Sequence, residues 1–137
     1  MAPIGGGQAG FGSGGSFTGP AEALEVIGNH AYALSGSFAS AGGGSADTTY
    51  LSFTSGNYYF VGTLHIYEKT AGAHERFADI SFNGVNIIEI KGDNNPDWLN
   101  IFPIELLIPP YTEVVVDAGS SDAASFSAVL VGRIYRD

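Results

Sequence analysis

The 137-residue sequence contains no cysteine, so disulfide bonds and cysteine-ligated zinc sites are excluded. Basic residues are scarce as well: five Lys and Arg residues face fourteen Asp and Glu residues, and the formal net charge is -9. Proteins that bind nucleic acids need basic clusters to neutralise phosphates. We therefore expect no direct nucleic-acid binding, and the same charge disfavours contact with anionic membranes.

Long apolar runs are missing too. No segment approaches the ~18 consecutive apolar residues of a transmembrane helix. The first seven residues, MAPIGGG, lack the positive region and the apolar stretch of a signal peptide. The sequence thus predicts no membrane span and no export by the general secretory route.

Catalytic and metal-binding motifs are also lacking. There is no G-x-S-x-G elbow, and the glycine runs at 5–7 and 42–44 lack the Lys-Ser/Thr of a phosphate loop. The three histidines, His30, His65 and His74, do not have the spacing of metal ligands. We expect a protein that is not an enzyme and has no cofactor and no metal.

Two groups of acidic residues leave alternatives open. The loop from Asp93 to Asp97 is rich in oxygen ligands and could hold Ca²⁺, but it lacks the EF-hand frame, and tight turns use the same residues. Glu105 and Glu113 flank the Pro109-Pro110 corner and could approach each other as a glycosidase pair does. Surface turn chemistry and outward-facing strand acids are the preferred interpretations.

What the sequence does contain predicts one folded domain behind a flexible arm. Hydrophobic residues make up 45% of the chain and aromatic residues 12%, which is enough to build a core. Residues 1–20 are rich in Gly and Ser, carry no charged side chain, and cannot form a core of their own. We assign residues 1–20 to the arm and residues 21–137 to the domain.

The domain reads as β-strands separated by turns. Alternation of period two predicts about eight strands, which gives an antiparallel β-sandwich, most simply a single jelly roll. Asn83-Gly84 predicts a type I′ hairpin turn, and Pro103 predicts a sheet edge or a bulge. Residues 20–27 could form a short helix, but a first strand is favoured. The predicted strands are 30–40, 48–54, 58–68, 77–82, 85–91, 99–108, 112–118 and 126–136.

Aromatic residues outside the predicted core are the candidate contact residues. Tyr59 and Tyr67 lie on the face of 58–68 opposite its core residues, Trp98 follows the Asn-rich loop, and Phe11 and Phe17 are isolated in the arm. Exposed Tyr and Trp suit a subunit interface or sugar stacking. The small residues Ala31, Ala33, Ser35, Ser37 and Ala39 form one face of 30–40, which could admit another layer or be solvated.

The C-terminal region resembles the β-sandwich virion proteins of bacteriophages. The similar elements are the corner and Val-rich strand in IPPYTEVVV (108–116), the closing strand AVLVGRIY (128–135) and the hairpin ISFNGV (80–85). The resemblance covers residues 77–136. It implies a capsid decoration, vertex or minor capsid protein, in the virion and assembled in the host cytoplasm, with no catalytic residues.

From this resemblance we expect the partners to be other capsid protein subunits, in a homo-oligomer that is a trimer or a pentamer. The arm would gain ordered contacts with a neighbouring subunit on docking. The alternative function is a carbohydrate- or receptor-binding module, such as the head of a fibre, which would bind glycan through Trp98 or Tyr59.

Overall fold

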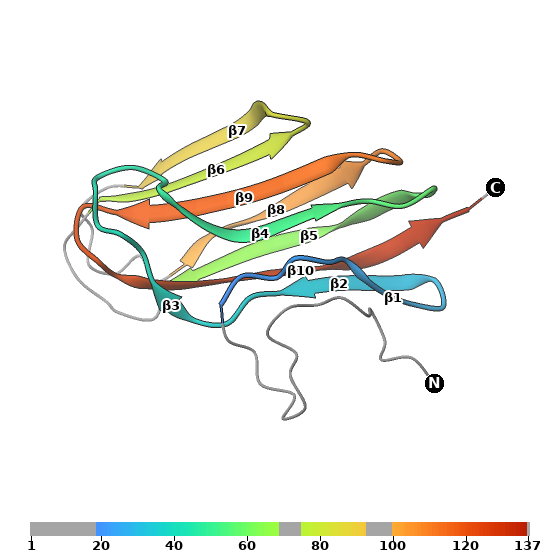
Figure 1. Ribbon diagram of the computed structural model, residues 1–137, viewed down its shortest axis with the longest axis horizontal. Helices are drawn as coiled ribbons and strands as arrows, with labels where there is room; N and C mark the ends of the chain where they lie inside the picture. The colour runs from blue at the N-terminus through green and yellow to red at the C-terminus, as the bar shows by residue number, and fades with distance from the viewer. Residues whose placement is uncertain (1–18, 69–74, 93–99, 137) are drawn as a thin grey trace.

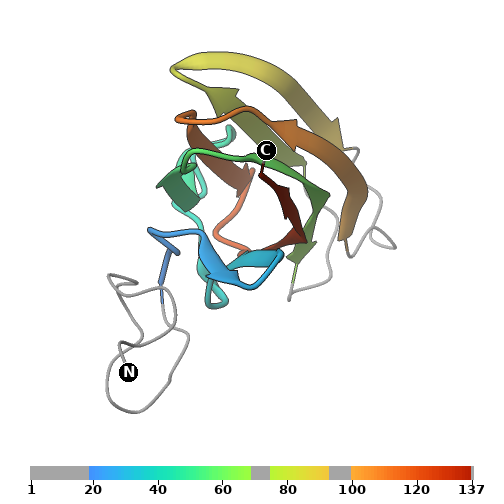
Figure 2. The same cartoon turned by 90° about the vertical axis from the view of Figure 1, so that its right-hand side faces the viewer.

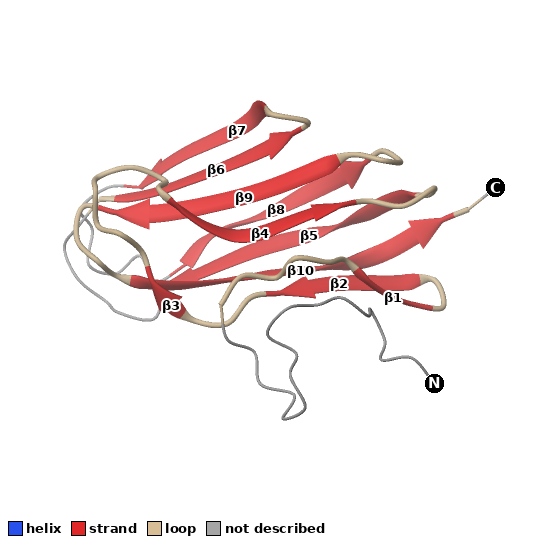
Figure 3. Ribbon diagram, in the orientation of Figure 1, coloured by secondary structure: helices blue, strands red, loops and turns tan. Residues whose placement is uncertain are grey.

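The computed structural model describes residues 19–68, 75–92 and 100–136. Within these ranges the chain is all-β, with ten strands and no helix (Figure 3). No helix there is long and apolar enough to cross a membrane. The strands are β1 (Glu25–Ile27), β2 (His30–Leu34), β3 (Phe38–Ala39), β4 (Thr48–Thr54), β5 (Tyr59–Glu68), β6 (Arg76–Phe82), β7 (Val85–Gly92), β8 (Asn100–Ile108), β9 (Glu113–Ser120) and β10 (Ser125–Tyr135).

The strands form two antiparallel sheets (Figure 1). The six-stranded sheet has the order β1-β2-β10-β5-β8, and the short β3 pairs with β10 as well. The four-stranded sheet has the order β4-β9-β6-β7. Figure 2 shows the two sheets from one end, where they curve around a shared interior. The arrangement is that of a β-sandwich-like fold.

One hydrophobic core lies between the sheets, because every long strand turns alternate residues inward. Tyr50 of β4 joins the two layers: its ring stacks on Phe38 at 4.2 Å and meets the edge of Phe126 of β10 at 6.2 Å. The Tyr50 hydroxyl donates a hydrogen bond of 2.8 Å to the Phe38 carbonyl. Burial is the main reason that the pKa of Tyr50 rises to about 12.

Most of the sequence-based strand predictions are confirmed, and so are most of the core residues on them. Phe60, Leu64 and Ile66 of β5 are buried, as are Val114 and Val116 of β9. Asn83 and Gly84 have φ angles of 51° and 82° and connect β6 to β7, as a type I′ turn requires. β8, which contains Pro103, is an edge strand with a register shift opposite Leu64 and Ile66.

Two predictions on the N-terminal strands need correction. The predicted strand 30–40 is split, because the Gly36 amide bonds to the Gly19 carbonyl at 2.9 Å instead of continuing a ladder. Its small face is divided in the same way: Ala31 and Ala33 point into the core and are 2% and 0% exposed, whereas Ser37 and Ala39 are exposed. The larger side chains of β2 therefore point outward. Residues 20–27 contain a strand and no helix.

The segment before β1 ties the two sheets together along one side. The Ala21 amide donates to the Tyr50 carbonyl at 3.0 Å, and the Ser52 amide donates to the Ala21 carbonyl at 2.9 Å. Ala21 thus pairs with β4 of the four-stranded sheet just before the chain enters β1 of the six-stranded sheet.

A buried ion pair also links the sheets. Arg76, the first residue of β6, donates through Nε to Oε1 of Glu68, the last residue of β5, over 2.6 Å. The two side chains are 0% and 1% exposed. Because β5 and β6 belong to different sheets, the pair joins the two layers.

Candidate interaction face

The outward-facing side of the six-stranded sheet carries many apolar side chains. We call this side the outer face. Its apolar members include Leu107, Val61 and Ile27, which are 57%, 43% and 48% exposed. Isolated exposed apolar residues are normal, whereas a contiguous patch on adjacent strands indicates an interaction site. The other exposed large hydrophobic residues of this face are Tyr59, Tyr67, Val131 and Tyr135.

The strand register places these residues in rows across the sheet. One row runs through all five strands, from β8 to β1: Leu107, Val61, Arg133, His30 and Ile27. Cross-strand neighbours of this kind have Cβ atoms about 5 Å apart, so the row forms one continuous strip.

The next row along the strands continues the outer face. It contains Glu105, Thr63, Val131 and Tyr32, and it ends at Glu25 of β1, which is 0% exposed and adds no surface charge. The positive charge of the two rows lies on β10, and Glu105 lies on the opposite side, on the edge strand β8. Apolar residues and Thr63 separate the two signs.

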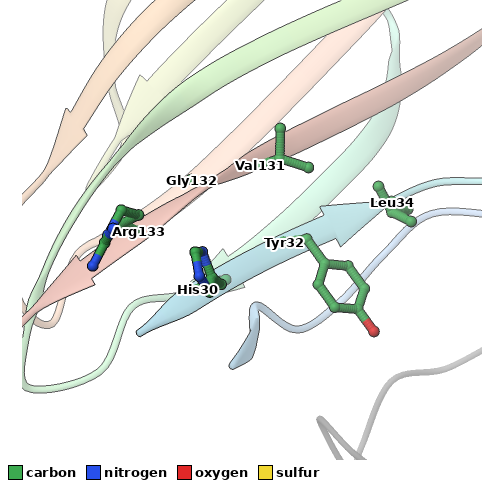
Figure 4. A pocket seen from close by; sticks show the side chains of 7 residues that line it. His30, Tyr32, Leu34, Val131, Gly132 and Arg133 are labelled. Atoms are coloured by element: carbon green, nitrogen blue, oxygen red, sulfur yellow. The ribbon is translucent and has the colours of Figure 1, made fainter. Parts of the chain in front are cut away.

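A shallow open groove of about 510 Å³ lies over β2 and β10 (Figure 4). Val131 and Leu34 supply apolar walls, while His30 and Arg133 lie side by side at one end. The groove presents mainly apolar surface with two nitrogen-bearing side chains. It is therefore suited to an apolar partner that carries a negative charge.

The outward side of the four-stranded sheet has the opposite character. Asp117, Asp79 and Glu89 are consecutive cross-strand neighbours on β9, β6 and β7. The pKa of Asp79 is raised by partial burial first, and then by the charges of Glu89 and Asp117. This side repels another acidic surface, so the two sides of the protein differ in what they can bind.

No protein-family model matches the chain, and no curated protein is significantly similar to it. Within the described ranges, no group of three or more His, Asp and Glu residues is placed to hold a metal ion.

The candidate residues from the sequence are placed only in part. Tyr59 and Tyr67 lie on the outer face of β5 and are 49% and 40% exposed. Phe11, Phe17 and Trp98 lie outside the described residues, as do His74 and the loop from Asp93 to Asp97.

The other candidate side chains are separated by the fold. His30 and His65 are on β2 and β5, with β10 between them. Glu105 and Glu113 belong to different sheets, and both are exposed. The structure does not show these two carboxylates facing each other across a cleft.

The apolar members of the outer face were missed by the sequence-based selection, which considered only aromatic residues. A signal was present in the strand 126–136, where Val129 and Val131 alternate with Ala128 and Leu130. A strand that is apolar on both faces is typical of one covered from both sides. The same pattern in 58–68 includes Val61.

The carboxylate of Glu25 is buried. Its residue is 0% exposed, and among the residues that the structure describes neither carboxylate oxygen has a hydrogen-bond partner. Burial raises the pKa of Glu25 above its ordinary value of 4.5. The folded protein therefore holds this proton more tightly than the unfolded chain, and stability falls as the pH rises from about 4.5 through the raised value.

We expect Glu25→Gln to remove this pH-dependent loss. The variant should be about 1 kcal/mol more stable than the wild type at pH 7, because it avoids an uncompensated buried charge. The gain should vanish at pH 4, where the wild-type carboxyl is protonated in both states. Urea unfolding followed by far-UV circular dichroism at both pH values, at one protein concentration, measures the difference. An equal difference at the two pH values would contradict the assignment.

One end of the fold presents a strained aromatic residue. Tyr111, between β8 and β9, has a φ of 53°, which is rare for a bulky side chain, and it is 70% exposed. Its amide donates to the Gly56 carbonyl at 2.9 Å. Ser55 braces the same corner, because its hydroxyl donates to the Pro109 carbonyl at 2.7 Å and accepts from the Thr112 amide at 2.8 Å.

Proposed function

We propose that the protein is a non-enzymatic structural subunit of a virion shell, a capsid decoration, vertex or minor capsid protein, which forms homo-oligomers. The outer face is the observation that carries this proposal. A continuous strip across five strands, in which Leu107, Val61 and Ile27 flank Arg133 and His30, has the composition of a protein interface: exposed apolar side chains together with Arg and nearby aromatic residues. Its partners would be other shell subunits.

The strand order supports a jelly roll, the finer form of the fold that the sequence suggests. Without the short β1 and β3, eight strands remain, and they pair from the outside inward. The first, β2, pairs with the last, β10; β4 pairs with β9, β5 with β8, and β6 with β7. Nested pairing of this kind is what a jelly roll requires, and jelly rolls are common in viral capsid and lectin domains.

The experiment that tests this proposal is the solution mass of the full-length protein by light scattering over a range of concentrations. We expect a homo-oligomer that Val61→Lys dissociates, because the substitution replaces an apolar side chain of the strip with a second positive charge beside Arg133. Ile87→Lys is the matched control: Ile87 is 44% exposed against 43% for Val61, but it lies on β7 of the other sheet. A wild-type protein that stays monomeric at every concentration would rule out the homo-oligomer.

A carbohydrate- or receptor-binding module is the second candidate, and the aromatic end of the fold favours it. Tyr59 and Tyr135 are cross-strand neighbours, 49% and 54% exposed, and Tyr111 is held outward by a strained backbone. Exposed aromatic rings stack on sugars, and strained residues gather at functional sites. Glycan-array binding that disappears in Tyr111→Ala or Tyr59→Ala would favour this function over assembly.

A further inference from the structure

The outer face carries both signs of charge in an arrangement that can complement itself. Arg133 and His30 are exposed on the adjacent strands β10 and β2, and Glu105 is exposed on β8, two strands away from β10. Within the described ranges, neither Arg133 nor Glu105 has an ion-pair partner. Each copy therefore presents a positive charge on the β2–β10 side of the outer face and a negative charge on the β8 side.

We infer that the outer face binds the outer face of a second copy about a two-fold axis parallel to the strands, so that Glu105 of each copy meets Arg133 and His30 of the other. This inference rests on the proposed function, since it names the partner of the same face. A two-fold contact is isologous, meaning that both copies use the same surface.

The strand order determines which strands of the two copies face each other across such an axis. An axis in the plane of contact, midway between β10 and β5, places β10 opposite β5 of the other copy and β2 opposite β8. The rotation does not shift positions along the strands. Glu105 therefore falls opposite the row of Tyr32, one two-residue step (about 7 Å) from the row of His30 and Arg133. The long Glu and Arg side chains can span that diagonal.

The size of the face fits a stable contact. Strands β2, β10, β5 and β8, about 4.8 Å apart, offer about 500 Å² of flat area before the relief of the side chains is added. A standard protein interface buries about 800 Å² of accessible surface per partner. The area of the outer face is therefore comparable with the area that each partner buries in a standard interface.

The charge distribution also favours a second copy meeting this face. The chain has a net charge of -9. The row of Asp117, Asp79 and Glu89 makes the outward side of the four-stranded sheet repel the same side of a second copy. The outer face instead has Arg133 exposed amid apolar residues. Two copies can therefore approach through this face with the least repulsion. The resulting assemblies are even-numbered, unlike the trimer or pentamer expected from the resemblance.

The test uses the full chain and two charge reversals, Glu105→Arg and Arg133→Glu, in analytical ultracentrifugation. Each variant alone should dimerise at least about tenfold more weakly than the wild type, because like charges then meet twice across the axis. An equimolar mixture of the two variants should dimerise again, since both contacts between positions 105 and 133 in the mixed dimer join opposite charges. Glu89→Arg, which makes the same change in net charge as Glu105→Arg but on the other sheet, should leave the dimer intact.

Three results would overturn the inference, and only one of them also removes the proposed homo-oligomer. A monomeric wild type removes both. A wild-type oligomer that both reversals leave intact uses another surface, so the assembly function stands and this face is excluded. Variants that dissociate alone but do not associate when mixed show that these charges do not meet across a two-fold axis. Circular dichroism of each variant confirms that the exposed substitutions leave the fold intact.

Discussion

Glu68→Gln is expected to lower the free energy of unfolding by about 3–5 kcal/mol, the usual cost of removing one partner from a buried ion pair. Arg76 is 0% exposed, and its Nε lies 2.6 Å from Glu68 Oε1. With the carboxylate gone, a guanidinium charge stays inside the fold where water cannot solvate it. Urea unfolding followed by far-UV circular dichroism measures the loss.

The chain provides a matched control in an exposed ion pair. Lys91 Nζ lies 3.0 Å from Glu75 Oε2, with side chains that are 65% and 38% exposed. Lys91→Gln should cost less than about 1 kcal/mol, since solvent screens an exposed pair. Equal costs for Lys91→Gln and Glu68→Gln would show that burial does not set the strength of the Glu68–Arg76 pair.

Gly132→Ala is expected to cost about 3 kcal/mol, at the upper end of the range for overpacking a core. Gly132 of β10 is the register partner of Gly62 of β5. A Cβ on Gly132 would collide with the Val61 carbonyl oxygen, lie 2.5 Å from the Gly62 Cα, and lie 2.8 Å from the Phe60 ring. Two of these three contacts are backbone atoms of the neighbouring strand, so relief requires the strands themselves to move.

Gly28→Ala separates crowding from the general effect of replacing a glycine. Gly28 has a φ of 60°, and no atom lies within 4 Å of a Cβ built there. Its substitution should cost about 1 kcal/mol, from backbone strain alone. Thermal unfolding of both variants at one protein concentration gives the comparison. If Gly132→Ala is no more destabilised than Gly28→Ala, the close approach of β5 and β10 is not what requires glycine.

The strand pattern could be predicted from the sequence because alternation and turn residues are local signals. Asn83-Gly84 identifies the β6–β7 hairpin on its own, and the inward residues of β5, β9 and β10 follow from their period. Alternation of residue type along a strand does not show which of its two faces points into the core. In β2 the larger residues suggested a core face, but Tyr50 and Phe126 already fill the interior near β3 and β10, and small alanines occupy the inward positions of β2.

The candidate face could be predicted only in part, because it depends on pairings between strands far apart in the sequence. Tyr59 and Tyr67 were found from their own strand. That Arg133 lies beside His30, with Glu105 two strands from β10, follows from the order β2-β10-β5-β8, which no local pattern contains. The Glu68–Arg76 pair was missed for a similar reason: both residues flank a loop, where charged residues are usually solvated.

The central position of β10 has a consequence for how the protein folds during synthesis. Strand β10 pairs with β2 on one side and with β5 on the other. Until Ser125–Tyr135 is present, β2 and β5 are therefore not joined in one sheet. A growing chain on the ribosome must hold β2 and β5 with open edges until Ser125–Tyr135 has been synthesised. Closing the long loop between β2 and β10 slows the completion of the sheet, and the chain without β10 is the form most exposed to aggregation and to chaperones.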